Sequence, residues 1–288
     1  MWFMLALLSA LFQVLRNMAM KRLGHALDET INVWGRFTFL LPFAAAGVVV
    51  IGVPEIQAGF WTMAVLFGIV QTLATLSLSK ALKVADISLV TALWKISLLI
   101  LVGWAFLTLG ETPSPLGLTG VLLSMVGVYL LNVHRARVSV WAPLVSLVQD
   151  AGQRWTVLAG IGYAVAVVLI KRMAQLSDPV FAVFLGYVFC SAIVTPYVLC
   201  TSAAHFRQVG RYWKSFVGMG AAGTLSTWFG TTAYTLTLSS YVEAVKQIEI
   251  VLALAIGYLF FKEGPRIRLI WAGTVVIMAG MVLLKLGD

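Results

Sequence analysis

Three ionisable residues stand in the first half of a long apolar segment, residues 239–261 (SSYVEAVKQIEIVLALAIGYLFF). Glu243, Lys246 and Glu249 are spaced three apart, and at 100° per residue of a helix they fall with Gln247 within an arc of about 160°. Neighbours at this spacing are close enough to form ion pairs or to relay charge. The chemistry that this pattern favours is the binding of a charged solute.

A purely structural role for the same three residues is the alternative. Glu243 lies near the expected start of a helix, where the helix dipole and interfacial water can satisfy a carboxylate. Lys246 and Glu249 can form a fixed internal ion pair. A charge in the middle of a membrane costs about 2.5 to 3.5 kcal/mol on insertion scales, so such groups usually face a cavity and pair with one another.

The composition places this segment in a membrane. Of the 288 residues, 61% are hydrophobic and 11% are charged, which leaves too little polar surface to cover a soluble globule. A helix needs about 20 apolar residues to cross the hydrocarbon core, and lipid favours helices over open strands because it offers the backbone no hydrogen-bond partners. The sequence predicts an all-α membrane protein with ten transmembrane helices, at residues 2–20, 31–52, 59–79, 86–109, 115–133, 155–173, 179–200, 215–237, 241–261 and 267–285.

The net charge of +9 is better explained by orientation in a membrane than by binding to nucleic acid, and no nucleic-acid partner is expected. With ten spans, both termini lie on one side. Most basic residues fall in loops on the other side, whereas the terminal side has Lys171, Arg172 and Lys285. The positive-inside rule therefore predicts that both termini lie outside the cytoplasm.

The two halves of the chain are similar to each other at an offset of 152 residues. Residues 78–111 align with residues 230–263, and each of these segments ends in an acidic residue followed closely by proline. Other matched positions are Arg16 with Lys171 and, allowing one inserted residue, Gly120 with Gly273 and Gly127 with Gly280. The predicted organisation is a five-helix repeat over 1–135, a linker over 136–153 and a second repeat over 154–288.

The odd number of helices in each repeat has a physical consequence. The second copy must enter the membrane from the face opposite to the first. Inverted repeats of this kind are typical of secondary transporters, whose substrate site lies near the membrane midplane between the two halves.

Several motifs add a family resemblance that covers nearly the whole chain. They are the pair Arg36–Phe37, a third helix rich in small residues, and the segments LGETPSPLGLTGVLLSMVGVYLL and FFKEGPRIRLIWAGTVVIMAGMVLL. These motifs resemble the EamA-type members of the drug/metabolite transporter superfamily. The resemblance implies a ten-helix transporter of small organic solutes, with a central cavity lined mainly by the first, third, fourth, sixth, eighth and ninth helices. The location expected for such a chain is the inner membrane of a bacterium.

The first repeat supplies a partner surface for the charged helix. Lys95 aligns with Gln247 and Trp94 with Lys246, and Lys95 lies about nine residues into its run, too deep for easy snorkelling. We expect Lys95 to contact the substrate or a carboxylate across the cavity; its alternative role is a structural counter-ion to Glu249. This cavity suits an anionic or zwitterionic metabolite, amino-acid-like or an organic acid, and protonation of Glu249 would couple its transport to a proton gradient.

Other polar residues are weaker candidates for the same cavity. Gln71, Tyr163, Trp228 and Tyr234 lie in helices expected to line it, and the aromatic rings can stack or make cation–π contacts. Hydrogen bonding between helices is the common alternative role of polar groups in spans. Arg36 is a candidate site residue for two reasons: it belongs to the family motif, and a charged side chain in a membrane span costs free energy unless it has a function or a partner. It would close a gate or bind a substrate anion.

Nothing in the sequence predicts an enzyme, a cofactor or a metal site. GMGAAG (218–223) matches a dinucleotide-binding pattern but follows no predicted strand, and the three histidines are scattered. The expected partners are a small-molecule metabolite, membrane lipid and protons, for a monomer or weak dimer. Two other functions stay open at this point: an exporter of broad specificity, and a lipid-carrier flippase or non-transporting membrane subunit.

Overall fold

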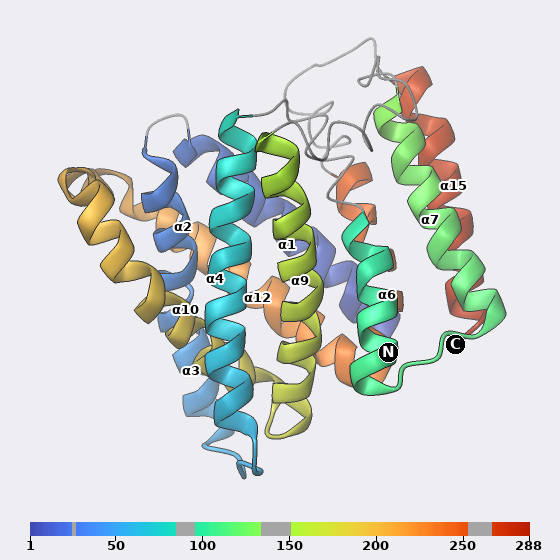
Figure 1. The fold of residues 1–288 in the computed structure, drawn as a ribbon, viewed down its shortest axis with the longest axis horizontal. Helices are drawn as coiled ribbons and strands as arrows, with labels where there is room; N and C mark the ends of the chain where they lie inside the picture. The colour runs from blue at the N-terminus through green and yellow to red at the C-terminus, as the bar shows by residue number, and fades with distance from the viewer. Residues whose placement is uncertain (25–26, 85–95, 134–150, 253–266) are drawn as a thin grey trace.

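The computed structural model describes residues 1–24, 27–84, 96–133, 151–252 and 267–288, and every regular element in these ranges is a helix (Figure 1). The described helices of the first half are α1 (Trp2–Gly24), α2 (Glu29–Thr38), α3 (Leu41–Ile51), α4 (Phe60–Val84), α6 (Ile96–Leu109) and α7 (Pro115–Val133). Those of the second half are α9 (Ala151–Gln175), α10 (Pro179–Ser202), η1 (Ala203–His205), α11 (Phe206–Val209), η2 (Gly210–Tyr212), α12 (Trp213–Leu236), α13 (Ser239–Lys246) and α15 (Ile267–Leu286). The all-α prediction is confirmed for the described residues.

Five described stretches are long and apolar enough to cross a membrane. They are Trp2–Met20, Glu29–Ile51, Phe60–Ala81, Ala151–Gln175 and Pro179–Leu236, the last of which contains both α10 and α12. Three shorter apolar helices, Ser97–Leu109, Pro115–Gly127 and Gly273–Leu286, accompany them. The chain is therefore an integral, multi-pass membrane protein. The count of ten spans and the boundaries of the two repeats stay predictions, since most of the predicted linker lies outside the described residues.

The two ends of the chain lie close together (Figure 1). The indole N–H of Trp2 donates a hydrogen bond to the carboxylate of Asp288 at 2.5 Å. Thr237, which follows α12, donates to the other oxygen of the same carboxylate at 2.7 Å. The side of the membrane on which the ends lie stays a prediction.

Local sequence explains where some helices begin. Asp178 caps α10, because its side chain accepts hydrogen bonds from the backbone N–H groups of Val180 at 2.7 Å and Phe181 at 3.4 Å. Pro179 follows as the first residue of that helix, where its missing N–H costs nothing. Pro42 stands in the first turn of α3, and the chain turns between α2 and α3 just before it.

The helices of the two halves pack on one another reciprocally. In the repeat alignment α1 corresponds to α9, α4 to α12 and α7 to α15. The most extensive packing joins α1 to α12, α4 to α9 and α7 to α15. Exchanging the two halves therefore turns the α1–α12 contact into the α9–α4 contact and leaves the α7–α15 contact unchanged. A two-fold relation between the halves would produce this pattern.

Glycines at the contact of α7 with α15 show the same reciprocity. A Cβ added to Gly120 would lie 2.7 Å from the carbonyl oxygen of Gly280, and one added to Gly127 would lie 2.8 Å from that of Gly273. The alignment pairs Gly120 with Gly273 and Gly127 with Gly280, so the two contacts exchange under the same operation. Small residues at these positions let the two backbones approach closely. The inverted topology of the repeats stays a prediction that this packing supports.

The helix expected over 241–261 is not continuous in its described part. α13 ends at Lys246, Gln247 forms a turn, and helix resumes over residues 248–252. The backbone N–H of Gln247 bonds to the carbonyl of Ala244, three residues back, at 3.2 Å. The carbonyl of Glu243, which an unbroken α-helix would give to that N–H, instead accepts the side-chain amide of Gln247 at 3.1 Å. At the interruption, the Gln247 side chain therefore takes the hydrogen-bond position of the missing backbone N–H.

A buried ion pair of Lys171 and Glu111 lies at the end of the helix bundle where the two chain ends meet, so Lys171 is on the terminal side as expected but is not a free surface charge. Its ammonium nitrogen lies 2.8 Å from a carboxylate oxygen of Glu111, and both side chains are at most 7% exposed. Lys171 also donates to the carbonyl of Thr237 at 2.7 Å. Glu111 in turn accepts the backbone N–H and the hydroxyl of Ser239, each at 2.8 Å. The pair thus connects the end of α6 to α9 and to the start of α13.

Candidate functional site

A cavity of about 530 Å³ lies between the two halves of the bundle. It is lined by α1, α2, α4 and α6 from the first half and by α9, α10, α12, α13 and the residues after α13 from the second. Its volume falls in the range of about 300 to 1,000 Å³ that is usual for small-molecule sites. The cavity can therefore hold a metabolite of modest size.

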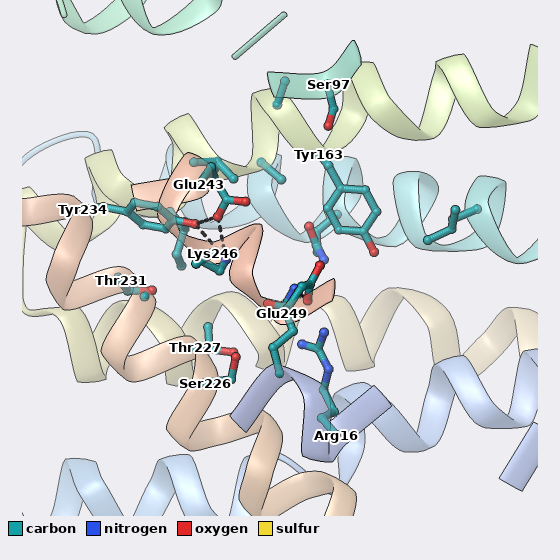
Figure 2. Close-up of a pocket in the computed structure, with 18 of the residues that line it drawn as sticks. Arg16, Ser97, Tyr163, Ser226, Thr227, Thr231, Tyr234, Glu243, Lys246 and Glu249 are labelled. Carbon is teal, nitrogen blue, oxygen red and sulfur yellow. Dashed lines mark hydrogen bonds and ion pairs between the residues drawn. The ribbon is translucent and has the colours of Figure 1, made fainter. Parts of the chain in front are cut away.

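One part of the cavity carries a compact ionic cluster from α12 and α13 (Figure 2). The ammonium of Lys246 lies 2.5 Å from a carboxylate oxygen of Glu243, and the hydroxyl of Tyr234 donates to the same oxygen. Lys246 is also 3.4 Å from that hydroxyl and lies over the Tyr234 ring. Glu243 is therefore held by side chains from two helices and does not depend on the helix dipole and interfacial water alone.

Glu249 occupies a separate position in the cavity wall, after the interruption at Gln247. In Figure 2 it lies between the Glu243–Lys246 cluster and Arg16. Its carboxylate accepts a hydrogen bond from the side-chain amide of Gln13 on α1. This contact joins the first helix of one half to the charged segment of the other half.

Two arginines of the first half, Arg16 and Arg36, add positive charge to the cavity wall. Arg16 of α1 and Arg36 of α2 both line the cavity. A guanidinium nitrogen of Arg36 lies 3.4 Å from the hydroxyl oxygen of Tyr163 on α9, and that hydroxyl is 3.0 Å from the hydroxyl of Thr75 on α4. A chain of polar contacts therefore crosses from the first half of the molecule to the second.

The structure brings together most of the residues predicted for the site. The cavity is lined by Arg36, Gln71, Tyr163, Tyr234, Glu243, Lys246, Gln247 and Glu249. Trp94 and Lys95 lie outside the described residues, so their contacts with substrate stay predictions. Trp228 lies away from the lining and packs on α3, where a Cβ added to Gly47 would be 2.3 Å from its ring.

Several lining residues were not singled out from the sequence as site residues. They include Gln13, Arg16 and Asn17 of α1, Asn32 of α2, Ser97 of α6 and Thr227 of α12. Arg16 could have been predicted from the sequence, because a charge deep in an apolar run is costly unless it faces a cavity or a partner. Ser97 could also have been predicted, since it aligns with the site candidate Glu249 in the repeat.

The arrangement suits binding of a charged solute more than chemical conversion. The charged side chains among the described lining residues are three cationic ones, Arg16, Arg36 and Lys246, and two acidic ones, Glu243 and Glu249. Within the described ranges, no group of three or more His, Cys, Asp or Glu residues is placed to hold a metal ion. Charges of both signs around one small cavity can bind an anionic group and a cationic group of the same solute.

Similarity to known proteins identifies the family of this chain. One solved structure, described only as "Crystal structure of protein", is similar to this chain with a TM-score of 0.79 and 18% sequence identity, over 99% of this chain and 96% of that one. At this identity the likeness shows the fold alone. No curated protein matches the sequence significantly. The family model of the EamA-like transporter family matches residues 1–133 and 151–286, nearly the whole chain. The resemblance drawn from the sequence is thus confirmed, and the chain belongs to the EamA-like transporter family.

Proposed function

We propose that the protein is a secondary transporter that carries a small carboxylate-bearing metabolite, anionic or zwitterionic, across the inner membrane of a bacterium by alternating access. The observation that carries this proposal is the cavity itself, which both halves line and which holds charged groups of both signs. Sites of this kind, between two repeats and beside an interrupted helix, are usual in transporters built from inverted repeats.

The helix packing supports the alternating-access part of the proposal. The three main contacts between helices exchange under a swap of the two halves. A molecule built in this way has two equivalent arrangements, in each of which the cavity opens to a different side. The ion pair of Lys171 and Glu111 holds one end of the bundle in the arrangement described here.

Charge in the cavity favours a selective transporter over an exporter of broad specificity. Arg16, Lys246 and Glu249 are costly at membrane depth, and their cost is offset by a solute of complementary charge. We also propose protons as the coupling ion, with Glu249 as the group that takes up and releases the proton. It is a cavity carboxylate on a segment whose helix is interrupted, where protonation changes the local charge balance.

Uptake by purified protein in liposomes tests this proposal. The solutes are matched sets that share one side chain: an α-amino acid, its amide, the decarboxylated amine and the deaminated 2-oxo acid. We expect uptake of the carboxylate-bearing members and at least about tenfold less uptake of the amide and the amine, the loss that follows when a buried charged hydrogen-bond partner is left unmatched. Protein-free liposomes give the background. Equal uptake of all four members of a set would contradict the proposal. So would the absence of uptake of every solute in sets that cover a broad range of side chains.

A further inference from the structure

We propose that Arg16 and Arg36 together form the subsite that binds the carboxylate of the substrate. This inference rests on the proposed function only in taking the cavity as the place where a solute binds. It shifts the main anion contact from Lys95 of the first repeat, as expected from the sequence, to two arginines on α1 and α2.

Arg16 is a buried cation that the described residues leave without a carboxylate partner. Its side chain is 8% exposed, and its two hydrogen bonds both go to the side-chain oxygen of the next residue, Asn17, at 3.1 and 3.3 Å. A second cation, Arg36, lines the same cavity. No ion pair between described residues neutralises the charge of Arg16.

Arg36 is similarly placed to take an acceptor. Its hydrogen bond goes to the hydroxyl of Tyr163 at 3.4 Å, which is long for a guanidinium donor. Its Nε–H is buried and has no hydrogen-bond partner within the part of the chain that the structure describes. None of the ion pairs between described residues involves either arginine.

Two cationic side chains in the wall of one cavity at membrane depth are unfavourable unless an anion compensates their charge. A guanidinium presents a planar fork of N–H donors that matches a carboxylate with two parallel hydrogen bonds. A carboxylate bound by both Arg16 and Arg36 would compensate their charge and use the donors that the described residues leave free. Among the described residues, nothing else supplies an anion paired with either arginine.

Among the described lining residues, the charge balance favours one carboxylate over a more highly charged phosphate. These residues carry three cationic and two acidic side chains, so a singly charged anion balances their charge. Glu249 lies near Arg16 and would repel a second negative charge. The same carboxylate would attract an ammonium group, so an amino-carboxylate matches both.

Two neutral groups on the wall are further evidence that a polar ligand belongs here. Asn32 and Thr231 are lining residues, and the side-chain oxygen of each is buried without a hydrogen-bond partner among the described residues. Buried polar atoms are rarely left unmatched. An amino-carboxylate offers N–H donors to both.

Thermal unfolding of the purified wild-type protein with simple carboxylates tests the subsite without knowledge of the substrate. Sodium formate and sodium acetate are titrated against sodium chloride at constant ionic strength, and the midpoint of unfolding is followed. We expect acetate and formate to raise the midpoint above the chloride value. Arg16→Gln and Arg36→Gln should each raise the half-saturating acetate concentration about tenfold or more, as expected for a lost hydrogen bond to a charge.

Arg172→Gln is the matched control, because Arg172 is exposed at the end of α9 and should leave the acetate response unchanged. If a glutamine variant does not fold, Arg16→Lys and Arg36→Lys are judged by the same criterion, since lysine keeps the charge but lacks the paired donors. A wild-type protein without preference for carboxylate over chloride would overturn the subsite, and so would a wild-type response in either arginine variant.

The subsite and the proposed function fail in different ways. A protein that takes up amino acids in liposomes but shows no carboxylate-specific stabilisation keeps its transport function and loses this subsite. A protein that is stabilised by acetate through both arginines but takes up no solute keeps the subsite and loses the function.

Discussion

Replacing Lys171 with methionine is expected to lower the free energy of unfolding by about 3 to 5 kcal/mol, the usual result of breaking a buried ion pair from one side. The ammonium of Lys171 is 2.8 Å from Glu111, and both side chains are at most 7% exposed. Methionine fills the space of the lysine stem but leaves the carboxylate of Glu111 with the N–H and hydroxyl of Ser239 alone. Denaturation of the purified protein in mixed micelles measures the change.

The neighbouring residue provides the matched control for this experiment. Arg172 is exposed, and its hydrogen bond to Gln175 is long, at 3.4 Å. Arg172→Met should therefore change the free energy of unfolding by less than about 0.5 kcal/mol, as is usual for surface positions. The double variant Lys171→Met with Glu111→Gln should recover part of the loss, because it removes the uncompensated charge. A Lys171→Met protein as stable as the control would show that this pair does not hold the bundle closed.

Glu249→Gln is expected to reduce uptake of the α-amino acid about 10- to 150-fold, the equivalent of losing one hydrogen bond to a charged group. The residue lines the cavity, and Gln13 can still donate to the new amide oxygen, so the fold should survive. The amide cannot hold the negative charge that attracts an ammonium group, nor can it carry a proton. Uptake into liposomes at several pH gradients measures both effects.

The pH gradient separates binding from coupling. In the wild type each unit of pH difference can support about a tenfold accumulation if one proton moves with each solute. In Glu249→Gln the remaining uptake should be indifferent to the gradient. Glu55→Gln is the control, since Glu55 is exposed in the connection before α4. Gradient-driven accumulation that persists in Glu249→Gln would exclude this carboxylate as the proton carrier.

Much of the fold could be predicted from the sequence because apolar length and repetition are strong constraints. The predicted spans 2–20 and 155–173, for example, begin and end within a few residues of α1 and α9. The break at Gln247 could not be predicted in this way. At the break, a side-chain amide bonds the carbonyl of Glu243, and neither hydropathy nor helix propensity detects such a local contact.

The candidate site could be predicted in part. Ionisable residues in apolar runs pointed to Glu243, Lys246, Glu249 and Arg36, all of which line the cavity. Trp228 was chosen for its aromatic ring on a helix that does line it, but its side chain lies on the other face of α12, against α3. Hydropathy places a helix in the membrane without fixing its rotation, and packing against neighbours decides which face meets the cavity.

Equivalent positions in the two repeats need not have the same role. Arg16 and Lys171 align, yet Lys171 forms a buried ion pair with Glu111 whereas Arg16 faces the cavity. Ser97 and Glu249 also align, and both line the cavity with different chemistry. A repeat alignment predicts where a residue lies more reliably than what it contacts, because aligned positions carry different side chains with different neighbours.

The central claim is that solute crosses the membrane through the cavity between the two halves. Its most direct test is uptake by a Ser97→Cys protein in a Cys200→Ser background, before and after reaction with a charged thiol reagent. Ser97 lines the cavity, and the remaining native cysteine, Cys190, is buried. The account predicts that modification stops uptake and that excess transported solute slows the modification. Full modification of this cysteine with unchanged uptake would contradict it.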